Sequence, residues 1–343
     1  MNSQDFDLNV YITHFVAPSK TFGGVIKSYL ELRMNLDYLR SWIRLLKHGT
    51  RGHQPWKKDV MTDARALETN NRLRYLHEVL TNLNLLKVKN LKINIITNSE
   101  EISKPFKSEL FGKNIKFHIY KKYKKYNWIH NSPWVTTSKN SPWLLTWEHK
   151  KLILEDLINS NQDSLFLYLE NDIKFTQSNL DYWLRHKDRL SKLGLIPSFT
   201  LMEYSATRSK WVSVSEFRNS PLKFDDLKST KIDFVDYVNL NNPYCACYLM
   251  DLEMVNEYSK SQAFSEVTSR SICSWDIGAR SAMGLTFVAI PQNFSARSVV
   301  PVYKNGSIYT IEPGALLEHL TNLYSKVSTI ETNMLDINQL IIE

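Results

Sequence analysis

The stretch SLFLYLENDIKF at residues 164–175 joins an apolar run to a pair of carboxylates. Residues 164–169 are almost wholly apolar, which is typical of a central strand covered on both faces of a sheet. Glu170 and Asp172 follow directly, and the carboxyl ends of central strands are where α/β sheets bind ligands. Because one residue separates the two carboxylates, they project to similar sides and can share one divalent cation that prefers oxygen ligands. The alternative is an ordinary polar exit from a strand into a loop, where Asn and Asp are common.

Strand-like and helix-like segments alternate on either side of this stretch. Runs rich in β-branched and aromatic residues predict strands, and apolar residues at helical spacing predict helices. The expected strands cover residues 9–17, 92–98, 115–120, 164–169, 198–204, 244–250 and 287–290. The expected helices cover residues 26–47, 63–86, 147–160, 176–190, 252–259, 275–283 and 336–343. This alternation favours an α/β fold, and 343 residues without a convincing linker favour one large domain.

The composition is that of an ordinary globular protein with two biases. Hydrophobic residues make up 43% and charged residues 23%, with a formal net charge of +8, 12% aromatic residues and only 10 glycines. These values exclude a disordered chain, a collagen-like repeat and a disulfide scaffold. The scarcity of glycine argues against the Gly-rich phosphate loops of dinucleotide-binding and P-loop folds. Positive charge with many aromatic residues favours an anionic partner, such as nucleic acid, membrane headgroups or sugars linked to phosphate.

The sequence suggests neither a targeting segment nor a membrane span. The opening residues, MNSQDFDLNV, have neither the basic start nor the apolar core of a signal peptide. No apolar run approaches the ~18–20 residues that cross a bilayer. Cys245, Cys247 and Cys273 are too few for a stapled secreted fold. We therefore expect a cytoplasmic protein whose membrane contact is at most peripheral.

The segment YLENDI at residues 168–173 resembles the YLEDDI-like signature of bacterial glycosyltransferases that build surface polysaccharide. A strand, an acidic-x-Asp motif and a following helix with Tyr182 and Trp183 are similar to the DxD region of GT-A-type glycosyltransferases. The sequence departs from DxD in having Glu170 first, which a metal should tolerate. The resemblance implies a GT-A-like, Rossmann-type central mixed sheet flanked by helices, within a single domain over residues 1–343.

The resemblance also implies a reaction and a division of the chain. Such enzymes transfer a sugar from a nucleotide-sugar donor and hold its diphosphate through Mn²⁺ or Mg²⁺, here at Glu170 and Asp172. Many add a late histidine as a further metal or diphosphate ligand, and His319 is the candidate. Residues 8–175 would form the nucleotide-sugar and metal half, and residues 176–330 the acceptor half with the C-terminal metal-ligand segment. The implied acceptor is a glycan or a lipid-linked saccharide in lipopolysaccharide or capsule synthesis.

Asp276 is the candidate catalytic base. Residues 274–280, SWDIGAR, loosely resemble the acidic motif of inverting GT-A enzymes. An inverting transfer needs a base that takes the proton of the acceptor hydroxyl, and we expect Asp276 in that role. In a retaining enzyme it would instead orient hydroxyl groups, and its alternative is a plain helix cap. Arg280 lies on the same helical face and can pair with Asp276 or with phosphate.

Several other polar residues are candidate donor or substrate contacts. His14 lies near the end of the first strand, where the resemblance places the nucleotide base; its alternative is a buried strand histidine. Arg51, His53 and Arg297 are candidates for neutralising the leaving diphosphate, with an ordinary surface residue as the alternative for each. Glu203 either binds sugar hydroxyls or ends an edge strand.

Residues 121–134, KKYKKYNWIHNSPW, interleave lysines with aromatic side chains. This segment either rests on an anionic membrane that carries the acceptor or is a solvated loop. Two other functions compete with glycosyl transfer. A nuclease or other nucleic-acid protein could use the same carboxylates for two-metal chemistry, but no nucleic-acid motif is present, so we expect no nucleic-acid partner. A non-enzymatic carbohydrate-binding protein would leave the acidic strand end unexplained.

Overall fold

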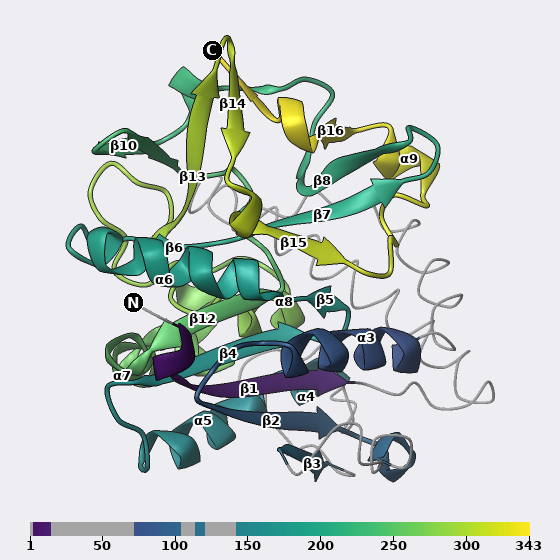
Figure 1. The fold of residues 1–343 in the computed structure, drawn as a ribbon, viewed down its shortest axis with the longest axis vertical. Helices are drawn as coiled ribbons and strands as arrows, with labels where there is room; N and C mark the ends of the chain where they lie inside the picture. Colours follow the sequence, from purple (N-terminus) through teal and green to yellow (C-terminus); the bar gives the residue numbers. More distant parts are fainter. Residues whose placement is uncertain (1–2, 15–71, 104–113, 121–141) are drawn as a thin grey trace, which may run out of the picture.

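The computed structural model describes residues 3–14, 72–103, 114–120 and 142–343 (Figure 1). A five-stranded sheet forms the lower half of the molecule in Figure 1, in the order β12-β4-β1-β2-β3. Its strands are β1 (Asp7–His14), β2 (Asn90–Thr97), β3 (Ile115–Ile119), β4 (Ser164–Glu170) and β12 (Cys247–Asp251). The first four are parallel, and β12 runs antiparallel to β4.

Strand β4 occupies an interior position of this sheet, as its apolar run predicts. Residues 164–169 are all buried, because β1 and β12 pair with its two edges and neighbouring elements cover its faces. Thr13 pairs with Glu170 in register, so the carboxyl ends of β1 and β4 meet at the same edge. The sheet therefore delivers the acidic motif to the edge where α/β proteins bind ligands.

Short helices surround the central sheet. Helix α5 (His149–Leu157) packs against β1, and α7 (Leu252–Lys260) packs against β4. Helix α7 begins at Asp251, whose side chain accepts a hydrogen bond from the Met254 amide, 3.0 Å away. The other helices beside the sheet are α3 (Arg72–Asn84), α4 (Pro142–Leu145) and α8 (Ile277–Ser281).

Helix α6 (Gln177–Ser191) lies between the central sheet and the strands above it (Figure 1). A capping box fixes its start, because the Thr176 amide donates to Asn179 Oδ1 at 2.8 Å and the Thr176 side chain accepts from the backbone of Asn179. Asn179 Nδ2 also donates to the carbonyl oxygens of Gly314 and Leu316, at 2.8 and 2.9 Å. The helix start is thereby tied to the segment that leads into β15.

A second five-stranded sheet, in the order β16-β8-β7-β15-β5, stands beside the acidic motif. Its strands are β5 (Ile173–Lys174), β7 (Thr200–Ser205), β8 (Lys210–Phe217), β15 (Leu316–His319) and β16 (Met334–Asp336). Strand β5 follows the acidic motif directly and pairs antiparallel with β15, with His319 opposite Ile173. This pairing carries His319 to the end of β4.

A third sheet forms the top of the molecule in Figure 1, in the order β10-β11-β13-β14-β17-β9, with β6 paired to β13. Its strands are β6 (Ile196–Pro197), β9 (Leu222–Lys223), β10 (Ser229–Ile232), β11 (Val235–Val238), β13 (Ser298–Asn305), β14 (Ile308–Ile311) and β17 (Ile341–Ile342). The chain is thus a mixed α/β fold with several mixed sheets, as the sequence predicts at that level.

Two predicted elements are wrong. Residues 287–290 form turns instead of a late strand, and Ala289 takes a left-handed φ of 44°, which an extended strand does not allow. Residues 336–343 form no α-helix: Asp336 caps a single 3-10 turn (Ile337–Gln339), and Ile341–Ile342 then pair with β14 and β9. The β-branched pair at the end suits a strand better than a helix.

Some predictions lie on residues that the structure does not describe. The expected helix at residues 26–47, the first part of the helix expected at 63–86, and the segment 121–134 all belong to these. Among the described residues, none of the helices has both the length and the apolar character needed to traverse a bilayer.

Candidate active site

Glu170 ends β4 and is held by a tyrosine. Its Oε1 accepts a hydrogen bond from the Tyr244 hydroxyl at 2.6 Å. Burial and the nearby Asp172 carboxylate raise the pKa of Glu170 to about 7, and the Tyr244 bond and His319 oppose that rise. A half-buried carboxylate beside a second carboxylate favours the binding of added positive charge.

His319 meets Asp172 across the pairing of β5 with β15. The Nε2 atom of His319 lies 3.4 Å from Asp172 Oδ2, and Thr321 Oγ1 lies 3.0 Å from the same Nε2. Burial lowers the pKa of His319, but the carboxylates of Asp172 and Glu203 raise it more, to about 10. His319 therefore supplies a positive charge beside Asp172.

Glu203 on β7 fixes the other side of the His319 ring. It is fully buried, and its Oε1 lies 2.5 Å from His319 Nδ1. Its Oε2 accepts the Ser325 amide at 2.7 Å, and Oε1 accepts the Tyr324 amide at 3.3 Å. The reading of Glu203 as the end of an edge strand is wrong, because β7 lies between β8 and β15. The contact of Glu203 with sugar hydroxyls stays a prediction. Glu203 orients the imidazole and sets which nitrogen faces Asp172.

His14 belongs to the same edge. It is the last residue of β1 and is buried, and its Nδ1 lies 2.9 Å from Nδ2 of Asn171, the residue between the two carboxylates. The bond ties the β1 end to the acidic motif. The alternative reading of His14, a buried strand histidine, describes this environment. The contact of His14 with a donor stays a prediction.

Asp276 comes to the site from the start of α8. Its side chain accepts a hydrogen bond from the Ala279 amide at 3.0 Å, which caps the helix. The neighbouring Trp275 stacks on Tyr244, with ring centroids 5.4 Å apart, and the negative charge of Asp276 contributes to the raised pKa of Glu170. The exposed Asp276 is therefore a helix cap whose charge also acts on Glu170.

The two predicted arginines that the structure describes are engaged in packing. Arg280 is buried, and its Nη1 donates to the Trp275 carbonyl oxygen at 2.9 Å. Burial and the charge of Arg270 lower the pKa of Arg280 to about 10. Arg297 donates through Nε to the Gly194 carbonyl oxygen at 2.8 Å and forms an ion pair with Glu257. Arg280 and Arg297 therefore both hold other parts of the fold in place. Their contact with a donor stays a prediction. Arg51 and His53 lie outside the described residues.

The side chains at the end of β4 offer oxygen ligands to a divalent metal. Within the part of the chain that the structure describes, no three His, Cys, Asp or Glu side chains are arranged as a complete metal centre. The nearby carboxylates of Glu170 and Asp172 are hard oxygen donors, which is the chemistry that Mg²⁺ and Mn²⁺ prefer. The residues fit a cation that takes two protein carboxylates and completes its shell from a diphosphate, as Mg²⁺ sites commonly do.

Sequence reasoning missed Tyr244 and the role of Glu203. Tyr244 lies before β12, and its contact with Glu170 depends on the antiparallel pairing of β12 with β4. The continuous apolar run at 244–250 predicts a strand but does not indicate which strand it pairs with. A polar aromatic residue beside an otherwise apolar run was the one available signal.

Comparison with known proteins gives no independent assignment. Neither a protein-family model nor a curated protein matches the chain.

Proposed function

We propose that this protein is a metal-dependent glycosyltransferase that moves a sugar from a nucleotide-sugar donor to a glycan or lipid-linked acceptor. One observation carries the proposal: the carboxylates of Glu170 and Asp172, the His319 imidazole and the Asp276 carboxylate gather at the carboxyl edge of a mainly parallel sheet. Those residues come from three separate regions of the chain, which argues that the cluster is a site and not a polar loop.

Glu170 and Asp172 would hold the metal, with His319 beside them. A divalent cation at this position supplies charge that stabilises the leaving nucleoside diphosphate. Tyr244 and His319 orient the two carboxylates through hydrogen bonds, and Glu203 in turn holds His319. The protein's own contribution is thus to present two carboxylates in a fixed geometry at the edge of the sheet.

Asp276 would remove the proton from the acceptor hydroxyl during an inverting transfer. A base must be within reach of that proton and deprotonated at working pH. Asp276 is exposed, and its chain neighbour Trp275 stacks on Tyr244, which donates a hydrogen bond to Glu170; both observations support this role. An acceptor hydroxyl that meets Asp276 therefore approaches the same edge at which the donor would be held.

Binding of a nucleoside diphosphate with Mn²⁺ tests the donor site. We expect UDP or GDP with Mn²⁺ to raise the melting temperature of the protein, because ligands that bind only the folded state stabilise it. The Asp172→Ala variant should lose that rise. Asp163→Ala is the matched control, because Asp163 is an exposed carboxylate just before the opposite end of β4. A rise that survives Asp172→Ala would contradict the assignment of the metal site.

A screen of nucleotide release from UDP-, GDP-, CMP- and dTDP-sugars identifies the donor. Slow hydrolysis of one donor, dependent on Mn²⁺ or Mg²⁺ and lost in Asp172→Ala, is the expected result. Metal-dependent cleavage of oligonucleotides that is lost in the same variant, with no release from any nucleotide-sugar, would replace the proposal with a nuclease function.

A further inference from the structure

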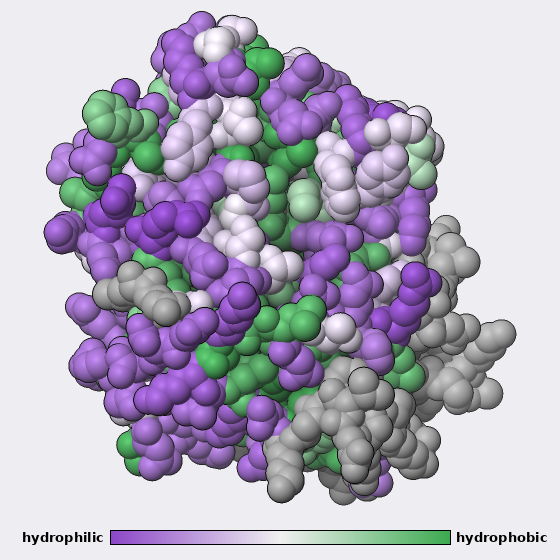
Figure 2. Space-filling model, in the orientation of Figure 1, coloured by the Kyte–Doolittle hydropathy of each residue, from purple (hydrophilic) through white to green (hydrophobic). Residues whose placement is uncertain are grey.

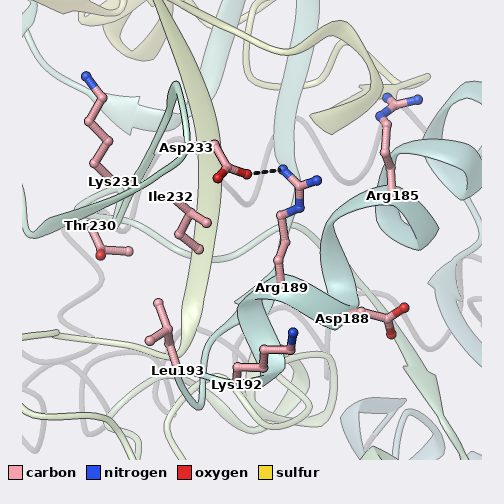
Figure 3. A pocket seen from close by; sticks show the side chains of 9 residues that line it. All are labelled: Arg185, Asp188, Arg189, Lys192, Leu193, Thr230, Lys231, Ile232 and Asp233. Carbon is pink, nitrogen blue, oxygen red and sulfur yellow. Dashed lines mark hydrogen bonds and ion pairs between the residues drawn. The ribbon is translucent and has the colours of Figure 1, made fainter.

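A second concave site lies at the far end of α6. It is a pocket of about 700 Å³ between the last turns of α6 and the hairpin of β10 and β11 (Figure 3). This volume is in the range of pockets that hold small ligands, which is about 300–1,000 Å³. Its wall includes four cationic side chains, Arg185, Arg189, Lys192 and Lys231, and two carboxylates, Asp188 and Asp233.

The positive charges of this pocket are only partly neutralised. Arg189 points across the pocket to Asp233, with 3.4 Å between Nη1 and Oδ2 (Figure 3). Both partners are well exposed, and such surface pairs contribute little. Among the residues that the structure describes, the side-chain amines of Lys192 and Lys231 have no hydrogen-bond or ion-pair partner. An incoming anion can therefore compete with Asp233 for Arg189 and recruit Lys192.

A buried network holds the arginines in place. His186 lies 2.7 Å from the Tyr237 hydroxyl through Nδ1 and 2.9 Å from Glu312 Oε2 through Nε2. Glu312 also forms an ion pair with Arg185. The Arg189 guanidinium lies near Tyr237, where it opposes the rise that burial causes in the pKa of that tyrosine. The guanidinium groups are therefore positioned before any ligand arrives, which favours binding of planar oxyanions.

The pocket is separate from the candidate active site. Helix α6 starts shortly after β5, the strand that follows the acidic motif, and its other end lies at the left side of the molecule in Figure 1. Fifteen helical residues span about 20 Å. Strongly hydrophilic side chains gather over α6 on this face (Figure 2). A ligand held here would not touch Glu170 or Asp172.

We propose that the pocket between α6 and the β10–β11 hairpin binds a phosphate- or carboxylate-bearing saccharide. The oxyanion would be bound by Arg189 and Lys192. The remaining wall, formed by Thr230, Ile232 and Leu193, offers a hydroxyl and aliphatic surface that suits a sugar ring. The saccharide part rests on the proposed glycosyl transfer; the anion part does not.

Calorimetric titration of the full chain with glucose 1-phosphate tests the pocket. The titration is done in EDTA and repeated with Asp172→Ala, so that the candidate active site does not contribute. We expect Arg189→Gln to weaken binding about tenfold and Lys192→Gln by a few fold, because each removes a charge-assisted bond. Asp233→Asn should strengthen binding by a few fold, because it removes the competing carboxylate.

The opposite sign of these variants separates binding from misfolding. Asp233 has a left-handed φ of 56°, which Asn adopts readily, so Asp233→Asn preserves the hairpin turn. Lys228→Gln is the matched control, because Lys228 is exposed just before β10 and does not line the pocket. We expect Lys228→Gln to leave the affinity unchanged. An equal loss in Lys228→Gln and Lys192→Gln would overturn the proposal by showing nonspecific charge attraction.

The source of the anion is settled by three further titrations. Weaker binding of inorganic phosphate and none of neutral glucose supports a sugar-borne anion. Inorganic phosphate binding as tightly as glucose 1-phosphate would overturn the saccharide assignment. Binding to phosphatidylglycerol vesicles that depends on Arg189, without binding of glucose 1-phosphate, would overturn it in favour of a membrane contact. The failure of all of these leaves the Mn²⁺ test of the active site unaffected, so the two proposals fail separately.

Discussion

At the scale of single residues, Glu203 holds three donors at once. The His319 ring and the amides of Tyr324 and Ser325 all share its buried carboxylate. Because His319 carries positive charge beside Asp172, its partner matters for both the fold and the site. The Glu203 carboxylate thus holds His319, which in turn lies beside Asp172, one of the residues that would meet a ligand.

Replacing Glu203 by Ala should destabilise the protein by about 3–5 kcal/mol, because it leaves a buried cation and two amides without their acceptor. Glu203→Gln keeps one acceptor oxygen and should cost clearly less. Urea unfolding at pH 7 measures the free energy of unfolding of both variants. Equal stability of Glu203→Ala and the wild type would show that water or another group replaces the carboxylate.

Asp276 combines a structural and a chemical role, and two substitutions separate them. Asn caps helices about as well as Asp, whereas Ala costs about 1 kcal/mol. Asp276→Asn should therefore keep the melting temperature and still lose about 10²–10⁴-fold in kcat if the carboxylate is the base. Asp276→Ala should lose both stability and activity. Unchanged transfer by Asp276→Asn would remove Asp276 from the mechanism.

At the scale of elements, α6 packs closely against the 3-10 turn Pro313–Ala315, which precedes β15. A Cβ atom on Gly314 would come within 2.4 Å of Tyr182 Cβ and 2.8 Å of the Ser178 carbonyl oxygen. There is no space for a methyl group unless the helix and the turn move apart. The position of His319 at the end of β15 therefore depends on the absence of a side chain at Gly314.

Gly314→Ala should cost about 3 kcal/mol of stability, because overpacking forces backbone shifts. Gly306→Ala is the control: its φ is +63° but no atom lies within 4 Å of its added Cβ, so only left-handed strain of about 1 kcal/mol applies. Chemical unfolding measures the free energy of unfolding of the two variants. A smaller loss in Gly314→Ala than in Gly306→Ala would mean that α6 and the turn are not rigidly packed.

The sequence predicts the parts of these elements that depend on local pattern. Strands β1 and β2 are rich in apolar and β-branched residues and β4 is an almost wholly apolar run, so their existence follows from the sequence. The contact of His319 with Glu203 joins residues 116 positions apart, and short strands such as β5 and β15 form only because each finds its partner. The acidic motif was therefore predictable, whereas the support around it depended on pairings that periodicity does not encode.

At the scale of the whole molecule, Glu312 links α6 to the third sheet, which contains β13 and β14. Its carboxylate contacts Arg185 and His186 on α6 and accepts the Tyr303 hydroxyl of β13 at 3.0 Å. Burial raises the pKa of Glu312, but the bonds from His186 and Arg185 outweigh it and lower the pKa to about 2. The ionised form therefore stabilises the fold.

Because the pKa of Glu312 is lower in the folded state than in the unfolded chain, its stabilisation is present above about pH 4.5 and is lost as the pH falls toward 2. Glu312→Gln should lower stability at pH 7 by about 1–2 kcal/mol, after allowing for solvent screening. The gap to the wild type should shrink by pH 3. Urea unfolding at pH 7 and at pH 3 measures this difference in the free energy of unfolding. Glu253→Gln, on the exposed side of α7, is the control. A gap that is the same at pH 7 and pH 3 would contradict the role of the charge.

The bond between His14 and Asn171 joins residues 157 positions apart. The parallel pairing of β1 with β4 can form only after this long loop has closed, and the entropy of closure is lost before the pairing compensates for it. Chains dominated by such distant pairings refold in about milliseconds to seconds, whereas helical bundles refold much faster. The edge that would bind the donor is therefore assembled slowly, and during that interval the apolar β4 run is available to other chains.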